Sequence, residues 1–98
     1  MAQVVLSGQA LTDLERFAAF LVKQDPTDAL AVGKAILRAL RILEAHPLIG
    51  RRFDDHLREL VISRGKRGYV ALYRFDEARD VVRVLALRHQ REAGYLED

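Results

Sequence analysis

The strongest indication of the fold is the stretch at residues 57–88, LRELVISRGKRGYVALYRFDEARDVVRVLALR. Apolar and polar side chains alternate in it with a period of two, which is typical of β-strands. The alternating runs are 57–63, 68–76 and 80–88. The two connections between them are too short for a parallel crossover, which needs roughly a dozen residues. The stretch therefore predicts three consecutive antiparallel strands joined by two hairpins.

Upstream of this stretch the hydrophobic period changes to that of helices. Apolar residues recur at three- and four-residue spacing over residues 9–23, and again after Asp25-Pro26. Proline is tolerated at a first helical position, whereas Pro47 ends the second pattern because it cannot continue the hydrogen-bond ladder. Two helices with so short a connection must form an antiparallel hairpin. A short apolar run at residues 3–7 predicts one further strand before them.

The order of these elements predicts an α+β fold. We expect a two-layer β-α-α-β-β-β arrangement in which the helical hairpin packs on one face of an antiparallel sheet. The chain has 98 residues, enough for one hydrophobic core and too few for two. Residues 1–98 are therefore expected to form a single domain.

The composition excludes several classes of function. The chain has no cysteine, so it can form neither a disulfide nor a thiolate metal site. Neither a signal-like N-terminus nor a long apolar span is present, and we expect a cytoplasmic protein that does not associate with a membrane. The motifs of nucleotide-binding proteins, metalloproteases and serine hydrolases are absent, so we expect no cofactor and no metal. Asp54, Asp55 and His56 read as a solvated turn.

Charge is distributed unevenly along the chain. Residues 1–50 hold five basic and five acidic side chains, whereas residues 51–91 hold eleven and six. The acidic residues that follow bring the net charge back to +2. A basic C-terminal half implies an anionic partner, either nucleic acid or an acidic protein segment.

Two basic groups are expected to meet at one end of the sheet. One lies on the turn that precedes the middle strand of the meander, and the other lies where the last strand ends. We predict a target-contact surface comprising Arg64, Lys66, Arg67, Tyr69, Arg88, His89 and Arg91. Guanidinium groups beside aromatic rings can hold phosphate oxygens or an exposed peptide. The alternative is an ordinary solvated hairpin whose charges prevent edge aggregation.

The order of several short motifs resembles the RelE/ParE toxins over residues 4–95. The motifs are Leu14-Glu15-Arg16, HPLIG at 46–50, LREL at 57–60, GYVALYR at 68–74 and VLALRHQR at 84–91. The resemblance implies a bacterial toxin that is neutralised by a cognate antitoxin in a hetero-oligomer. It also implies that the antitoxin folds an otherwise disordered segment onto the toxin.

The family has two activities, and the resemblance implies one or the other. RelE-like members cleave messenger RNA on the ribosome, and their cleavage relies on an arginine just after the start of the central strand. Here Val70 follows Gly68-Tyr69, which favours the ParE-like activity: inhibition of DNA gyrase by binding, with no catalytic residue. The alternative is a ribosome-dependent endoribonuclease. Its candidate catalytic residues are His89, Arg88, Arg91, Lys66 and Tyr95. A binding module that retains the fold without toxicity is a third possibility.

Overall fold

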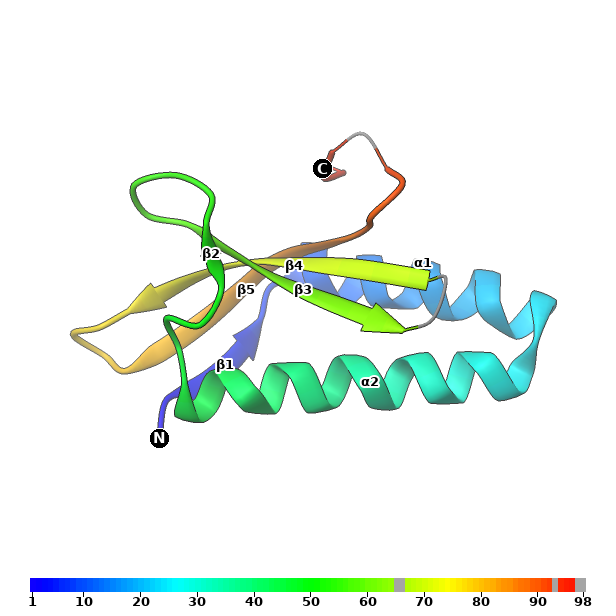
Figure 1. The fold of residues 1–98 in the computed structure, drawn as a ribbon, viewed down its shortest axis with the longest axis horizontal. Coiled ribbons are helices and arrows are strands. Elements are labelled where there is room, and N and C mark those ends of the chain that lie inside the picture. Colours follow the sequence, from blue (N-terminus) through cyan, green and yellow to red (C-terminus); the bar gives the residue numbers. More distant parts are fainter. Residues whose placement is uncertain (65–66, 93, 97–98) are drawn as a thin grey trace.

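The computed structural model describes residues 1–64, 67–92 and 94–96, without the side chains of residues 63, 64 and 67. Two helices run side by side along one face of a sheet, and the C-terminal segment lies on the opposite face (Figure 1). The elements are β1 (Gln3–Leu6), α1 (Gly8–Gln24), α2 (Pro26–Ala45), β2 (Arg51–Arg52), β3 (Arg58–Arg64), β4 (Arg67–Asp76) and β5 (Val81–His89). The predicted order of helices and meander strands is confirmed. No helix within the described ranges has the length and hydrophobicity needed to cross a bilayer.

Capping residues define the helical hairpin. The Ala10 N–H donates to Ser7 Oγ at 3.0 Å, which starts α1. Asp25 ends α1 and starts α2, because its Oδ1 accepts hydrogen bonds from the N–H groups of Thr27 and Asp28. Such caps satisfy amide hydrogens that have no partner within the helix. A single aspartate thus fixes the reversal between the two helices.

The sheet has five strands in the order β1-β5-β4-β3-β2. The pairings of β3 with β4 and of β4 with β5 are antiparallel, as the alternating stretch predicts. However, β1 pairs with β5 in parallel, from Gln3 opposite Val81 to Leu6 opposite Val84. The sheet is therefore mixed, and the expectation of a wholly antiparallel sheet was wrong for β1. The chain between β1 and β5 contains both helices and the strands β2–β4, so it is much longer than the connection that a parallel pair requires.

A second difference is β2, which lies between Pro47 and the alternating run that begins at residue 57, where no strand was predicted. Arg51 and Arg52 pair antiparallel with Glu59 and Arg58 of β3. Gly50 precedes this strand and packs so closely on Tyr73 that an added Cβ would lie 2.6 Å from the ring and 2.7 Å from the carbonyl oxygen of Glu59. The Gly50 N–H donates to the Tyr73 hydroxyl at 2.8 Å. Only glycine fits here, so the end of the HPLIG motif lies in direct contact with Tyr73 of the GYVALYR motif.

The core lies between the helices and the inner face of the sheet. The helices contribute Phe17, Leu21, Val32, Ile36, Leu40 and Leu43, and the sheet contributes Tyr69, Ala71, Tyr73, Val82, Val84 and Leu87. Because side chains alternate along a strand, those between the core residues of the sheet point to the outer face. There Val70 and Ala86 are also buried, although they do not belong to this core. The outer face is therefore covered in part, although Val61 on the same face is 38% exposed.

Candidate functional site

The strand register places the end of β5 beside the start of β4. Tyr69 pairs with His89, and Val70 pairs with Arg88. Arg64 pairs with Arg67 across the adjoining hairpin, so the backbone of both predicted basic groups lies at one end of the sheet. Lys66 and the side chains of Arg64 and Arg67 lie outside the described residues. The predicted contact residues whose side chains are described are Tyr69, Arg88, His89 and Arg91.

Successive side chains of β5 point to opposite faces, and this divides the predicted set. The Arg88 guanidinium lies on the outer face, 5.2 Å from the centre of the Tyr95 ring. The His89 ring lies on the helix side, edge-on to Tyr69 at 5.2 Å. Tyr69 in turn contacts Phe17 of α1, with 4.9 Å between ring centres. The residues of the endoribonuclease alternative therefore do not share one face.

On the outer face the buried carboxylate of Glu59 interacts with three other polar side chains. Glu59 is 7% exposed. Its Oε1 lies 3.1 Å from Arg51 Nε, and its Oε2 accepts a hydrogen bond from the Tyr95 hydroxyl at 2.5 Å. Arg88 Nη2 lies 3.8 Å from the same Oε2. We call Arg51, Glu59, Arg88 and Tyr95 the outer-face cluster.

The polar groups of the outer-face cluster already have partners within the protein. Burial, together with the hydrogen bond to the Glu59 carboxylate, raises the pKa of Tyr95 well above its usual value. Tyr95 therefore remains a protonated donor rather than a base. Arg88 also donates to the backbone carbonyl oxygens of His89, Gln90 and Glu92 at 3.4–3.5 Å. This arrangement holds the C-terminal segment against the sheet and leaves little capacity for a ligand.

On the helix side the same end of β5 borders a hollow of about 710 Å³. It is lined by Arg16, Phe17, Phe20, Tyr69, His89, Arg91 and Glu92, and we call it the α1–β5 hollow. Tyr69 is only 3% exposed, so this predicted contact residue forms the floor rather than the outer surface. Phe20 is 59% exposed at the wall. The Arg91 N–H donates to His89 Nδ1 at 3.1 Å, so the other ring nitrogen, Nε2, carries the hydrogen of the neutral ring.

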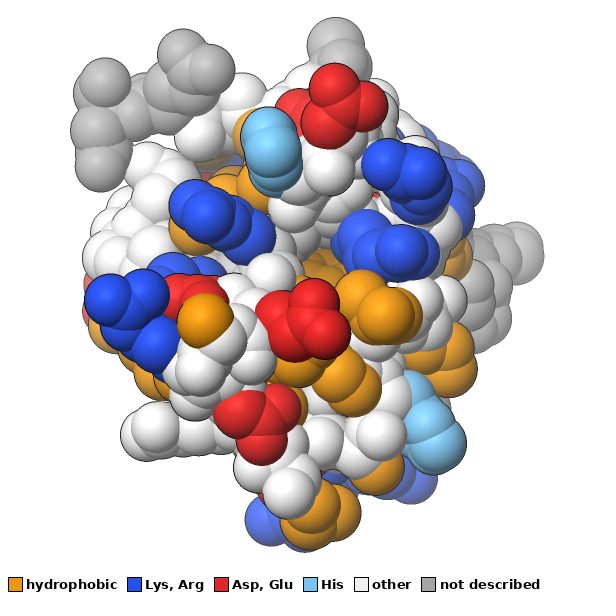
Figure 2. All heavy atoms as spheres, turned by 90° about the vertical axis from the view of Figure 1, so that its left-hand side faces the viewer, with side chains coloured by type: hydrophobic (Ala, Val, Ile, Leu, Met, Phe, Trp, Pro, Cys, Tyr) orange, Lys and Arg blue, Asp and Glu red, His pale blue; other side chains and the backbone are white. Residues whose placement is uncertain are grey.

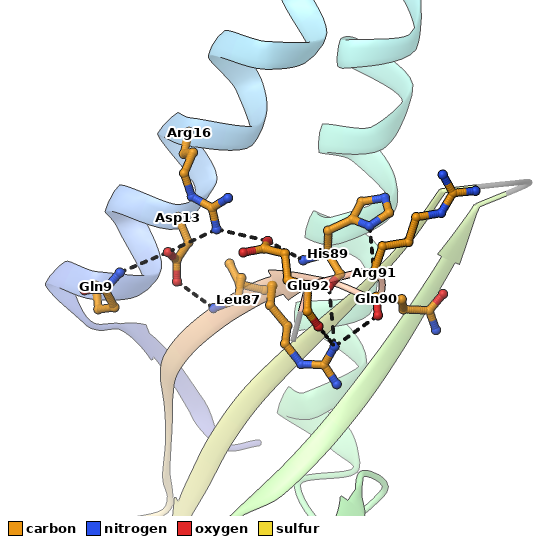
Figure 3. Close-up of polar contacts among 9 residues, drawn as sticks. Gln9, Asp13, Arg16, Leu87, His89, Gln90, Arg91 and Glu92 are labelled. Carbon is orange, nitrogen blue, oxygen red and sulfur yellow. Dashed lines mark hydrogen bonds and ion pairs between the residues drawn. The ribbon is translucent and has the colours of Figure 1, made fainter. Parts of the chain in front are cut away.

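A buried acid on α1 holds the adjacent edge of β5, and the sequence did not single it out. Asp13 is fully buried, and its Oδ2 accepts the Leu87 N–H at 2.8 Å. Arg16 Nη2 lies 3.7 Å from Asp13 Oδ1 and 3.2 Å from Glu92 Oε1, and Glu92 accepts the His89 N–H at 2.9 Å (Figure 3). The strand β1 ends before these positions, so side chains replace it as partners of the edge.

Asp13 had a signal in the sequence, whereas Glu59 had none. Asp13 lies three residues after Ala10 and four before Phe17, on the apolar stripe of α1, where an acid needs a partner. Glu59 alternates outward in β3, and strand periodicity predicts a solvated side chain there. Its burial comes from residues far along the chain, including Tyr95.

The other end of the sheet carries charges of both signs. Figure 2 views this end, and acidic and basic side chains are interspersed over it. Asp76 and Arg79 form an ion pair of 3.0 Å in the turn between β4 and β5. Asp54 Oδ1 accepts the N–H groups of His56 and Leu57, so the predicted solvated turn is confirmed. These hydrogen bonds lower the pKa of Asp54. Within the described ranges no group of three or more potential ligands is placed to hold a metal ion.

Relatives are found along nearly the whole chain. Residues 4–94 match the family described as the ParE toxin of the type II toxin-antitoxin system parDE. Toxin RelE3 of Caulobacter vibrioides is 34% identical over 92 residues, which cover 94% of this chain and 98% of that protein. Toxin RelE1 of the same bacterium is 35% identical over 71 residues, which cover 72% and 76%. A solved structure of the chromosomal ParDE TA system from P. aeruginosa has a TM-score of 0.73 at 20% identity, with 91% of this chain and 96% of that chain covered, and so shares the fold.

Proposed function

The chain belongs to the ParE toxin family of type II toxin-antitoxin systems, and we propose that this toxin arrests growth by binding DNA gyrase. A toxin of this class has an antitoxin as its partner. We expect the cognate antitoxin to neutralise the toxin in a hetero-oligomer. Gyrase acts in the cytoplasm, so the proposal also places the toxin there.

The main observation in favour of this proposal is that the basic residues are divided between two faces of the sheet. A nuclease centre needs its acid, base and charge-stabilising groups around one scissile phosphate. Here Arg88 and Tyr95 are held by Glu59 on the outer face, while His89 and Arg91 border the α1–β5 hollow. These side chains cannot converge on one phosphate without breaking the outer-face cluster. Binding to a protein target makes no such demand.

Val70 supports the same conclusion. It stands where the resemblance to RelE-like toxins implies an arginine, and it is 1% exposed on the outer face opposite Arg88. A larger arginine side chain at that position would have to displace the neighbours that bury Val70. The strand therefore supplies no charge at the place where RNA cleavage requires one.

A supercoiling assay tests the proposal. Purified toxin is added to gyrase, relaxed plasmid and ATP, and we expect supercoiling to be lost as the toxin concentration rises. Cognate antitoxin at equimolar concentration should restore it. Relaxation of the supercoiled form of the same plasmid by a type I topoisomerase controls for nonspecific binding of this basic protein to DNA. Undiminished supercoiling at every toxin concentration would contradict the proposal.

Ribosome-dependent cleavage of messenger RNA is the second candidate, because His89 and Arg91 lie together beside aromatic rings in the α1–β5 hollow. Its test is incubation of the toxin with ribosomes programmed with a defined messenger. Cleavage that disappears in the His89→Ala, Arg91→Ala double variant would support this candidate. Intact messenger with the unaltered toxin would eliminate it.

A further inference from the structure

The α1–β5 hollow combines a rigid aromatic wall with an exposed aromatic ring. Phe17 and Tyr69 are 7% and 3% exposed and contact each other, so the core fixes their positions. Phe20 lies one helical turn beyond Phe17 and leaves 59% of its surface open to solvent. Among the exposed large apolar side chains of the described residues, Phe20 is the one that borders the hollow. Exposed aromatic surface beside a concavity is typical of sites that bind another molecule.

The polar rim of the hollow offers hydrogen-bond donors. His89 Nδ1 is occupied by the Arg91 N–H, so Nε2 is its remaining donor. The Arg91 side chain is exposed, and no carboxylate in the described part of the chain pairs with its guanidinium. The hollow is therefore suited to an acceptor that carries negative charge and lies beside an apolar group.

The charges of the rim favour a single carboxylate over a chain of phosphates. The Arg16 guanidinium is already paired with Asp13 and Glu92. Glu92 itself lines the hollow, with 24% of its side chain exposed. Its carboxylate would repel a polyanion, because like charges at close range disfavour binding. One carboxylate on Arg91 avoids that repulsion.

We infer that the α1–β5 hollow is the surface that docks the target protein, by receiving an aromatic or large apolar side chain against Phe20 and an adjacent carboxylate on Arg91 and His89. This inference rests on the proposed function, because the occupant is a segment of gyrase. Anchors of this kind, an aromatic side chain in a pocket with a charged neighbour, dominate the energetics of many interfaces. The outer-face cluster takes no part in the docking.

Two substitutions in the hollow and two matched controls test the inference in the supercoiling assay. Phe20→Asp and Arg91→Glu alter the hollow. Leu11→Asp alters an exposed apolar residue on the same helix, and Arg41→Glu reverses an exposed charge on α2. We expect each hollow variant to raise the concentration for half-inhibition by about tenfold or more, and each control to change it by less than about twofold. All four proteins should unfold at the temperature of the unaltered toxin, since these side chains are exposed.

The outcomes separate this inference from the proposed function. Hollow variants that inhibit gyrase as well as the unaltered toxin would overturn the docking surface and leave gyrase inhibition standing. If the unaltered toxin fails to inhibit gyrase, the proposed function falls first. In that case, loss of ribosome-dependent cleavage in the hollow variants would assign the hollow to RNA and overturn the protein occupant.

A small probe gives a test that needs no gyrase. The dipeptide N-acetyl-Trp-Asp-amide carries the expected aromatic ring and carboxylate, and uridine monophosphate carries a base and a phosphate. In a nuclear magnetic resonance titration, the dipeptide should shift the ring resonances of Phe17, Tyr69 and His89. The shifts should vanish in Phe20→Asp and persist in Leu11→Asp. Stronger binding of the nucleotide, or no shift with the dipeptide, counts against the inference.

Discussion

Arg88 and Arg91 lie three residues apart in the chain, yet their surroundings differ in almost every respect. The Arg88 guanidinium is paired with buried Glu59, stacked on Tyr95 and bonded to backbone carbonyl oxygens. The Arg91 side chain is exposed at the rim of the α1–β5 hollow, with its backbone bonded to His89. Of these two basic residues near the end of β5, Arg88 is therefore engaged by the fold, whereas the Arg91 side chain is left at the surface.

These different surroundings decide which residues a functional experiment should alter. Charges of the outer-face cluster satisfy one another, so their removal damages the toxin before any target is added. At the hollow, Arg16 and Glu92 are likewise paired with each other, whereas no ion pair within the described residues engages the Arg91 guanidinium. Loss of toxicity in an Arg88 variant is thus weak evidence for contact with the target, whereas the same loss in an Arg91 variant is strong evidence.

The largest effect that would sharpen this comparison is expected from Glu59→Ala. Removing the carboxylate leaves Arg88 and the Tyr95 hydroxyl without their shared partner in a largely buried position. We expect the free energy of unfolding to fall by about 3 kcal/mol, measured by urea denaturation. Glu77→Ala, at an exposed turn, is the matched control and should change little. A loss as small as that of the control would show that Glu59 is not structural.

Tyr95→Phe should have the next largest effect. The variant keeps the ring beside Arg88 and Phe53 but removes the hydroxyl that donates to Glu59. We expect a loss of about 1–2 kcal/mol in the free energy of unfolding. The same substitution in the Glu59→Ala background, which removes the acceptor, completes a double-mutant cycle. If the two losses are additive in that cycle, Tyr95 and Glu59 do not stabilise the fold through each other.

The pH dependence of stability gives a third measurement on the same cluster. Because the pKa of Tyr95 is raised in the folded protein, the unfolded chain ionises first as the pH rises past the usual value of 10.0. The stabilisation is complete below that pH and is lost above it. We therefore expect the stability difference between the unaltered toxin and Tyr95→Phe to narrow from about pH 10 upward. A constant difference over that range would contradict the buried tyrosine–carboxylate bond.

The smallest effect on stability is expected in the hollow. Phe20→Ala and Arg91→Ala remove exposed side chains, so each should change the free energy of unfolding by no more than about 0.5 kcal/mol. The same denaturation experiment measures it. A loss comparable to that of Glu59→Ala would erase the contrast between the two regions, because Arg91 would then also be structural.

The helices and strands could be predicted from local sequence signals. The candidate site depends instead on contacts between residues that lie far apart in the chain. Capping residues, proline positions and local periodicity predicted both helices and the three-strand meander, since each of these signals acts over a few residues. The pairing of β1 with β5, the strand β2 and the split between Arg88 and His89 did not follow from the prediction of one basic patch. Alternation along β5 already implied that the side chains of neighbouring residues point to opposite faces of the sheet. Asp13 lies on the apolar stripe of α1, so part of the candidate site could have been predicted from the sequence.

By itself, the sequence determined the order of elements, the basic character of the C-terminal half and the resemblance to a toxin family, because these properties belong to residue types and their spacing. The burial of Glu59 and Asp13, and the contact of the C-terminal segment with part of the outer face, are visible only in the tertiary structure. The tertiary structure also decided that Arg91 is left at the rim of a hollow. Burial and charge pairing depend on residues that lie far apart in the chain, such as Glu59 and Tyr95, and no local pattern specifies their meeting.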